Sequence, residues 1–494
     1  MAKIDLVDIS IRDGNQSLWG ATGLNTAQIV QIAPIMDRVG FRALDFNSST
    51  HMAMAVRYKK ENPWDLIRLT HAAAPNTPLQ YITTGFRFIS WETADPDFMR
   101  LVYRSIAWAG IGRIIVLDPM HDLEGLLSSA QMAKEEGIAD VMAALTYTVS
   151  AVHDDAFYAG IARAVAACPY VDRAYIKDPA GILLPERART LVPAVKAALG
   201  NMPLEVHAHC TIGLAPLTYM VAAECGADAV HTGAGALANG TSLPPASRTV
   251  ANLREMGHQV DVNDHALALV ESYFTRLAEA EGLPKGAPQE FDAAYLRHQM
   301  PGGAITTLMR QLKELGQEDR LGAVIAEVPR VRAELGYPIM VTPFPQIVST
   351  QALFNVIGSA RYANVPDQVI RYVLGKFGRP TAPVDANVLD GILSMPRAKE
   401  LMAEAPALNP KELRKRFGPR MSDEELLLRA VMPEDQVDAM LKEGPAKLGY
   451  NPDTRTLVEL LRDVTARRDV SDLDVEKPGL KLSLRSRRPA AAHV

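Results

Sequence analysis

The chain of 494 residues has few cysteines, few aromatic residues and no strong excess of either charge. Its cysteines, Cys168, Cys210 and Cys225, form no Cys-x-x-Cys pair, which argues against a disulfide framework or a thiolate zinc site. With 52 basic and 57 acidic residues, the dense basic surface of a nucleic-acid binder is not expected. The sequence contains no apolar run of about 18 residues, so no membrane span is expected. The first residues also lack the apolar core of a signal peptide. We therefore expect a cytoplasmic enzyme.

What the sequence does contain is an alternation of short apolar runs and longer helical patterns. Strands are expected at 3–10, 41–47, 78–84, 112–118, 139–147, 171–177, 203–209 and 227–232. Helices are expected between them, at 26–39, 96–109, 123–136, 154–167, 185–199 and 214–225. Short, mostly apolar strands are typical of a parallel sheet that is buried on both faces. Eight such units predict a (β/α)8 TIM barrel, with a doubly wound open sheet as the alternative.

Polar residues at the ends of the expected strands favour the barrel. They are Asp8, Asn47, Thr84, Asp118, Thr146, Lys177, His207 and His209. In a barrel these ends converge on one mouth, whereas in an open sheet most of them lie far apart. An α/β barrel is therefore the predicted fold class.

The strand pattern fades after about residue 260. Helical patterns follow at 263–281, 301–316, 319–335, 363–376 and 422–442, and the last residues are charged and rich in proline and alanine. We predict three parts: a barrel over 1–260, a mainly helical C-terminal domain over 261–465, and a flexible tail over 466–494.

Two histidines suggest a metal centre at the predicted mouth. His207 and His209 are two positions apart on a strand and therefore share a face. Paired imidazoles at a barrel mouth suit a divalent metal, which also needs an anionic ligand. Asp8, at the end of the first strand, is the nearest candidate for that ligand.

Lys177 lies at the end of the sixth expected strand, where a buried ammonium is costly unless it is paired or modified. Three interpretations remain open on the residues alone. The amine forms an ion pair with Asp178 or Asp13, it acts as a Schiff-base nucleophile, or it is carbamylated and binds metal as an anion.

Several motifs together resemble a known family. They are DISIRDGNQSLWG, RYKKENPWDLIRL, TYTVSAVHD, YIKDPAGILLPERA, VHAHCTIG, GTSLPP, HQMPGG and VTPFPQIVSTQALFNV, in this order along the chain. The chain resembles the carboxyltransferase domain of pyruvate carboxylase, the alpha subunit of oxaloacetate decarboxylase and the 5S subunit of transcarboxylase. The resemblance covers roughly residues 3–445.

The resemblance implies a divalent metal (zinc, manganese or cobalt) held by a specific set of residues. By position, the implied ligands are Asp8, His207, His209 and a carbamylated Lys177. The resemblance therefore selects the third interpretation of Lys177.

The resemblance also implies roles around the metal. Gln16 matches a residue that contacts the substrate, and Thr241 matches the threonine that shuttles a proton between substrate and biotin. From the same first motif we assign Arg12 to substrate binding and Asp13 to catalysis.

One departure from the family pattern concerns the acceptor. The family has an arginine at the end of the third strand that pairs with the carboxylate of a 2-oxo acid, and this chain has Thr84 there. A hydroxyl does not replace a bidentate guanidinium, although Arg87, three residues on, offers one from a loop. We therefore expect a small carbonyl or carboxylate acceptor in an altered pocket.

The implied reaction moves a carboxyl group between carboxybiotin and the acceptor. No Met-Lys-Met segment for biotin attachment occurs, so we expect biotin on a separate carrier protein, a separate biotin carboxylase subunit, and a homodimer of this chain. The alternative is a biotin-independent, metal-dependent C–C lyase, aldolase or decarboxylase of the same barrel superfamily.

Overall fold

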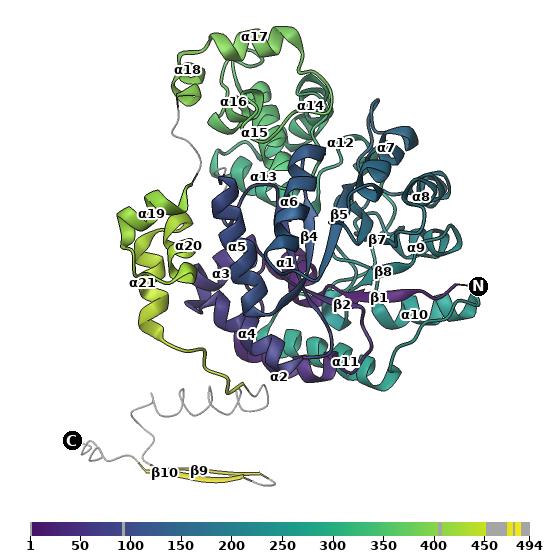
Figure 1. Ribbon diagram of the computed structural model, residues 1–494, viewed down its shortest axis with the longest axis vertical. Coiled ribbons are helices and arrows are strands. Elements are labelled where there is room, and N and C mark those ends of the chain that lie inside the picture. The colour runs from purple at the N-terminus through teal and green to yellow at the C-terminus, as the bar shows by residue number, and fades with distance from the viewer. Residues whose placement is uncertain (1, 91–93, 404–407, 451–471, 478–479, 486–494) are drawn as a thin grey trace, which may run out of the picture.

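The computed structural model describes residues 2–90, 94–403, 408–450, 472–477 and 480–485. Eight parallel strands form a closed barrel in which each strand pairs with the next and β8 pairs with β1 (Figure 1). The strands are β1 Asp5–Asp8, β2 Ala43–Ser48, β3 Leu79–Thr84, β4 Ile111–Leu117, β5 Asp140–Thr146, β6 Arg173–Asp178, β7 Leu204–Ala208 and β8 Ala229–Thr232. The predicted barrel is confirmed, and each strand lies within a residue or two of its expected range.

Helices alternate with the strands and cover the outside of the barrel (Figure 1). The α-helices are α1 Asn15–Trp19, α2 Thr26–Met36, α3 Ser49–Met54, α4 Pro63–Ala73, α5 Pro96–Ala109, α6 Leu123–Glu135, α7 Asp155–Ala166, α8 Pro185–Leu199, α9 Ala215–Glu224 and α10 Ala246–Glu255. Short helical segments are η1 Ser10–Gly14, η2 Ala55–Lys59 and η3 Gly235–Leu237. The π-helical segment η1 directly after β1 matters most for the site described below.

The sequence fits this architecture at the strand interiors and at the helix ends. One set of strand side chains forms a small cluster inside the barrel: Ile82, Ile115, Leu117, Met142, Ala144 and Tyr175. The opposite set packs against the helices in the large core. Gly110 ends α5 with φ of 117°, and a Cβ there would clash with the ring of His71. Glycine is therefore required at this helix end.

The region after residue 260 is helical, as expected. Its helices are α11 Asp264–Glu281, α12 Tyr295–His298, α13 Gly302–Glu314, η4 Glu318–Arg320, α14 Leu321–Glu334, α15 Phe344–Ile357, α16 Asp367–Val373, α17 Ala386–Ser394, α18 Pro396–Met402, α19 Pro410–Phe417, α20 Asp423–Val431 and α21 Glu434–Glu443. The segment 422–442, expected as one helix, is two, because Met432 before Pro433 adopts an extended conformation.

These helices divide between two hydrophobic cores. The core of the barrel includes Leu267 of α11 and Leu427 of α20, whereas residues from Met300 to Leu401 form a second core. Accordingly, α19 to α21 lie beside α3 to α5 in Figure 1. The core of the barrel thus includes helices that come before and after the second core in the sequence, and the division into domains at residue 260 stays a prediction.

The helices that form the second core, over residues from Met300 to Leu401, are called the second helical region below. This region is attached at the carboxyl ends of the strands. Arg87, which follows β3, donates a hydrogen bond of 2.6 Å to the carbonyl of Lys376. Arg332 of α14 donates to Thr148 Oγ1 and to the carbonyl of Val149, both after β5. The helices of the second core therefore lie on the same side of the barrel as the strand ends that carry the site.

The predicted flexible tail contains a described pair of strands. β9 Asp472–Lys477 and β10 Leu480–Arg485 pair antiparallel. Their alternation of apolar and charged residues is typical of strands, and the flexibility of the tail stays a prediction. The remaining residues of 466–494 lie outside the described ones. Among the described residues, no helix has the length and apolar character needed to cross a membrane.

Candidate active site

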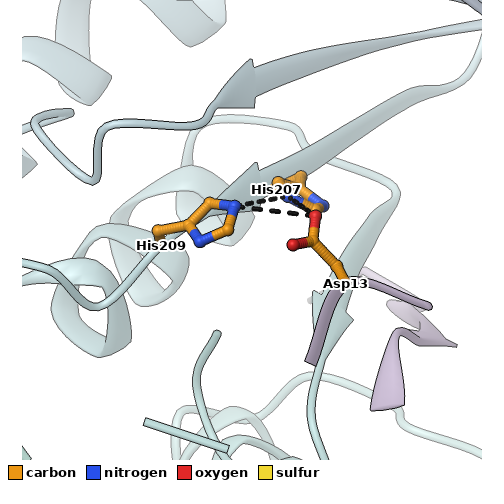
Figure 2. Close-up of side chains that lie close together, drawn as sticks. All are labelled: Asp13, His207 and His209. Carbon is orange, nitrogen blue, oxygen red and sulfur yellow. Dashed lines mark hydrogen bonds and ion pairs between the residues drawn. The ribbon is translucent and has the colours of Figure 1, made fainter. Parts of the chain in front are cut away.

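Three side chains from two chain segments meet at the barrel mouth. The π-helical segment η1 carries Asp13 over the mouth, and its Oδ2 lies 3.2 Å from His207 Nε2 and 3.6 Å from His209 Nε2. The two Nε2 atoms are 3.3 Å apart. Figure 2 shows the carboxylate and the two rings directed toward one another. One carboxylate oxygen and two imidazole nitrogens at these separations are a donor set that suits a divalent metal.

A backbone contact fixes the protonation of one ring. His209 Nδ1 lies 2.7 Å from the carbonyl oxygen of Thr241. Because a carbonyl only accepts, the proton of the neutral ring is on Nδ1, and the lone pair of Nε2 points toward Asp13 and His207. The residues present therefore fit a metal ion at this point.

The predicted ligand Asp8 is not part of this cluster, and the correction follows from strand register. Val7 pairs with His231 of β8, whose ring contacts His207, whereas Asp8 pairs with Thr232. Successive strand residues point to opposite faces, so the Asp8 side chain leaves the face that carries the histidines. Its carboxylate instead accepts hydrogen bonds from the backbone and hydroxyl of Ser10, each at 2.9 Å.

The surroundings of Asp8 and Asp13 shift the pKa values of the two carboxyl groups in opposite directions. Burial raises the pKa of Asp8 to about 7. Burial also acts to raise the pKa of Asp13, but the guanidinium of Arg12 holds it well below its ordinary value. Asp13 is therefore the carboxylate that stays ionised near neutral pH.

Lys177 lies beside the cluster. Its side chain is buried, and Nζ is 3.9 Å from Asp13 Oδ2. Asp178, the other predicted ion-pair partner, accepts a hydrogen bond from the backbone of Leu183, and as the next residue along β6 it points to the opposite face. Burial, helped by the charge of Arg12, lowers the pKa of Lys177 to about 8. Pairing with Asp178 is thus disfavoured.

Arg12, predicted to bind substrate, is engaged by carboxylates of the chain itself. Nε donates to Asp45 Oδ2 at 2.8 Å, and Nη2 lies 3.0 Å from Asp13 Oδ2. All three side chains are almost fully buried. The guanidinium therefore positions Asp13 and helps to keep it ionised.

Gln16 and Thr241 are both neighbours of Ser17, Gln16 in the sequence and Thr241 through a hydrogen bond. Gln16 is a partly exposed residue of α1, and the Thr241 hydroxyl donates to the carbonyl of Ser17 at 2.8 Å. The Ser17 hydroxyl donates in turn to Asp13 Oδ1 at 2.9 Å. The structure thus brings Thr241 to the rim of the cluster by one short chain of contacts.

Thr84 and Arg87 occupy different positions relative to β3. Thr84 is its partly exposed last residue. Arg87 is buried against the second helical region, with its guanidinium carbon 5.1 Å from the centre of the Phe377 ring and bonded to the carbonyl of Lys376. The guanidinium of Arg87 therefore contributes to the attachment of these helices.

Sequence reasoning missed Asp45, the partner of Arg12. A charged residue inside an otherwise apolar, buried strand was a usable signal, although a register shift in β2 between Asp45 and Asn47 interrupts the strand periodicity there. The position of Asp13 over the mouth, in contrast, depends on the π-helical segment. We recognised no signal for this segment in the sequence.

Comparison with known proteins finds similar carboxylase sequences. Residues 296–468 match the family model described as a conserved carboxylase domain, PYC_OADA. A pyruvate carboxylase subunit of Methanocaldococcus jannaschii is 32% identical over 97% of this chain and 84% of that protein. The 2-oxoglutarate carboxylase large subunit of Hydrogenobacter thermophilus is 29% identical over 91% and 70%, respectively.

The fold has a close counterpart among solved structures. The carboxyl transferase domain from Rhizobium etli pyruvate carboxylase superposes with a TM-score of 0.82, covering 98% of this chain and 84% of that one at 23% identity. The expected lyase alternative gains no support from these relatives, which are carboxylase subunits.

Proposed function

Because the chain belongs to the family of biotin-dependent carboxyltransferases that includes the pyruvate carboxylase subunit of Methanocaldococcus jannaschii, we propose that it moves a carboxyl group between carboxybiotin on a separate carrier protein and a small carbonyl acceptor. The observation that carries this proposal is the cluster of Asp13, His207 and His209 at the mouth of the barrel. Active sites of such barrels lie at this end of the strands.

The proposed metal ligands are Asp13, His207, His209 and a carbamylated Lys177. The donor set suits zinc, manganese or cobalt. A divalent metal bound there supplies positive charge close to the oxygen that becomes negative when the acceptor forms an enolate. Asp13 replaces Asp8 in this assignment because only Asp13 reaches the histidines.

Carbamylation of Lys177 is supported by its surroundings. Nζ attacks CO2 and releases one proton, which converts the amine into an anionic carbamate. Because burial lowers its pKa to about 8, the neutral, reactive amine forms more readily near neutral pH than that of an exposed lysine. The carbamate removes the cost of a buried ammonium and adds the negative charge that a metal with one carboxylate ligand still needs.

Proton transfer is assigned to Thr241. Its hydroxyl now donates to the carbonyl of Ser17, and rotation about χ1 redirects it toward the mouth. There Oγ1 takes a proton from the acceptor carbon that becomes carboxylated and passes its own hydroxyl proton to the ureido nitrogen of biotin, which loss of CO2 from carboxybiotin leaves negatively charged. Gln16 on the neighbouring turn contacts the acceptor. Bound carboxybiotin supplies the CO2 for this reaction.

The acceptor is proposed to be a small 2-oxo acid or related carboxylate. Thr84 presents a hydroxyl where a guanidinium would recognise a carboxylate bidentately, and Arg87 is held by Lys376 and Phe377. One relative is named for pyruvate and another for 2-oxoglutarate, so both compounds belong in any test of specificity.

The proposal includes partner chains and a location. Biotin is supplied by a carrier protein that a biotin carboxylase subunit charges, and this chain forms a homodimer. Its three cysteines are free, which is consistent with a reducing compartment and hence with the cytoplasm.

Reconstitution tests the proposal directly. The chain is combined with a biotin carboxylase, a biotinylated carrier, ATP and labelled bicarbonate, and is offered pyruvate or 2-oxoglutarate. We expect acid-stable label in one acceptor, dependent on ATP, on the carrier and on this chain. Avidin provides the control, since it sequesters biotin. Turnover of an acceptor that avidin leaves unchanged would instead identify a biotin-independent enzyme.

A further inference from the structure

A line of three buried side chains leads from the proposed metal ligands into the barrel. His207 Nδ1 lies 3.1 Å from His231 Nδ1, and His231 Nε2 lies 2.9 Å from Glu205 Oε2. None of the three residues is more than 1% exposed. Water is therefore excluded from the contacts, and each proton in them is assigned by its neighbours alone.

Glu205 fixes the direction of its own hydrogen bond with His231. Arg113 Nη2 and Arg173 Nη1 lie 2.6 and 3.1 Å from Glu205 Oε1. Two guanidinium groups keep this side chain as a carboxylate, which only accepts hydrogen bonds. The proton in its contact with His231 therefore belongs to His231 Nε2.

The positions of the other imidazole protons follow from this assignment. A neutral imidazole carries a single proton, so His231 Nδ1 is an acceptor. His207 Nδ1 faces it and must donate. When a metal is bound at the cluster, the lone pair of His207 is consequently on Nε2, the atom 3.2 Å from Asp13 Oδ2.

The ring of His231 is also held in orientation. Tyr175 stacks on it with ring centres 5.5 Å apart and an angle of 11° between the planes. The stacked contact and the hydrogen bond to Glu205 leave the His231 ring no freedom to turn Nδ1 away from His207.

We propose that Glu205 and His231 are positioning residues that hold His207 in the Nδ1–H form, with its Nε2 lone pair directed at the metal. The inference rests on the metal centre proposed above. His209 is set in the same form by the backbone carbonyl of Thr241, so the two ligands are prepared by different means. Only the His207 arrangement depends on side chains that substitution can remove.

Two substitutions of His231 separate proton direction from packing. His231→Phe keeps an aromatic ring for Tyr175 but removes the acceptor for His207 Nδ1. His231→Gln has an amide oxygen and an amide nitrogen with about the spacing of the two ring nitrogens, so it accepts from His207 and donates to Glu205.

The probe is Co²⁺, titrated into the metal-free full-length chain in competition with a chelator. We expect His231→Phe to weaken Co²⁺ binding about 10- to 100-fold, the usual effect of removing a partner of a metal-bound histidine. His231→Gln is expected to remain within a few-fold of the unsubstituted chain. Thermal melts of the metal-free proteins report whether packing alone has changed.

Equal Co²⁺ affinity for the phenylalanine variant and the unsubstituted chain would overturn the inference, as would equal weakening in both variants. Failure of the unsubstituted chain to bind Co²⁺ would instead overturn the proposed metal centre itself. A measurement without substitutions covers the case in which the phenylalanine variant does not fold. In the ¹⁵N-histidine-labelled chain loaded with Zn²⁺, two-bond NMR correlations should show His207 as Nδ1–H and His231 as Nε2–H, and the reverse pattern would refute the inference.

Discussion

Asp13→Asn is expected to release the bound metal and to slow carboxyl transfer by about 10²- to 10³-fold, the range typical for loss of a group that stabilises developing charge. The amide has nearly the same shape but no charge, so the metal loses an anionic ligand and Arg12 loses one of its two carboxylate partners. Metal content per chain, measured by mass spectrometry, and the rate of the reconstituted reaction report the two effects.

Asp8→Asn is the matched control for this substitution. Among the described residues Asp8 forms side-chain hydrogen bonds to Ser10 alone, and burial raises its pKa to about 7. We expect this variant to keep its metal and most of its activity. Loss of metal from Asp8→Asn, with metal retained in Asp13→Asn, would restore the assignment made from the sequence.

Thr241→Ala is expected to reduce carboxyl transfer by about 10²- to 10⁴-fold, the usual contribution of a positioned acid–base group, while the metal content stays unchanged. The reason for this separation lies in the backbone. His209 is oriented by the carbonyl of residue 241 and not by its side chain, so the substitution removes the hydroxyl without disturbing the ligand.

Thr241→Ser provides the control, since it returns a hydroxyl at the same position and should restore most of the rate. Carboxyl transfer and metal content are measured on the same preparations. An alanine variant that turns over at the unsubstituted rate would show that the proton moves by another route.

The fold was largely readable from the sequence because its signals are local. Each strand is a short apolar run, and glycines such as Gly110 end helices where a positive φ is needed. The division of the C-terminal helices between two cores was not readable. Which apolar face of α20 meets the barrel depends on distant residues such as Trp64, whose indole donates to the carbonyl of Glu424.

The candidate site was readable where strand periodicity governs it and not elsewhere. His207 and His209 were paired correctly by their spacing. The same rule places Glu205, two residues earlier, on the face of His207, so a further member of the site was within reach. Asp13 was harder, because the strand rule favours Asp8, and the π-helical segment that follows β1 brings the later carboxylate back over the mouth.

The arrangement as a whole shows how the barrel prepares a charged site in a dry interior. Arg12 and Asp45 hold Asp13 from one side, and Glu205 with its two arginines holds His207 through His231 from the other. Each hydrogen bond in these two sets involves either a charged side chain or an imidazole whose donor and acceptor nitrogens are fixed. Such hydrogen bonds are short and hold the side chains in one orientation.

Anomalous X-ray diffraction from metal-replete crystals tests the central claim most directly. We predict one strong peak, above the absorption edge of the bound metal, among Asp13 Oδ2, His207 Nε2 and His209 Nε2, with electron density extending beyond Nζ of Lys177 toward it. A peak bound by Asp8 instead, or no peak with Lys177 ending at a plain amine, would contradict the account.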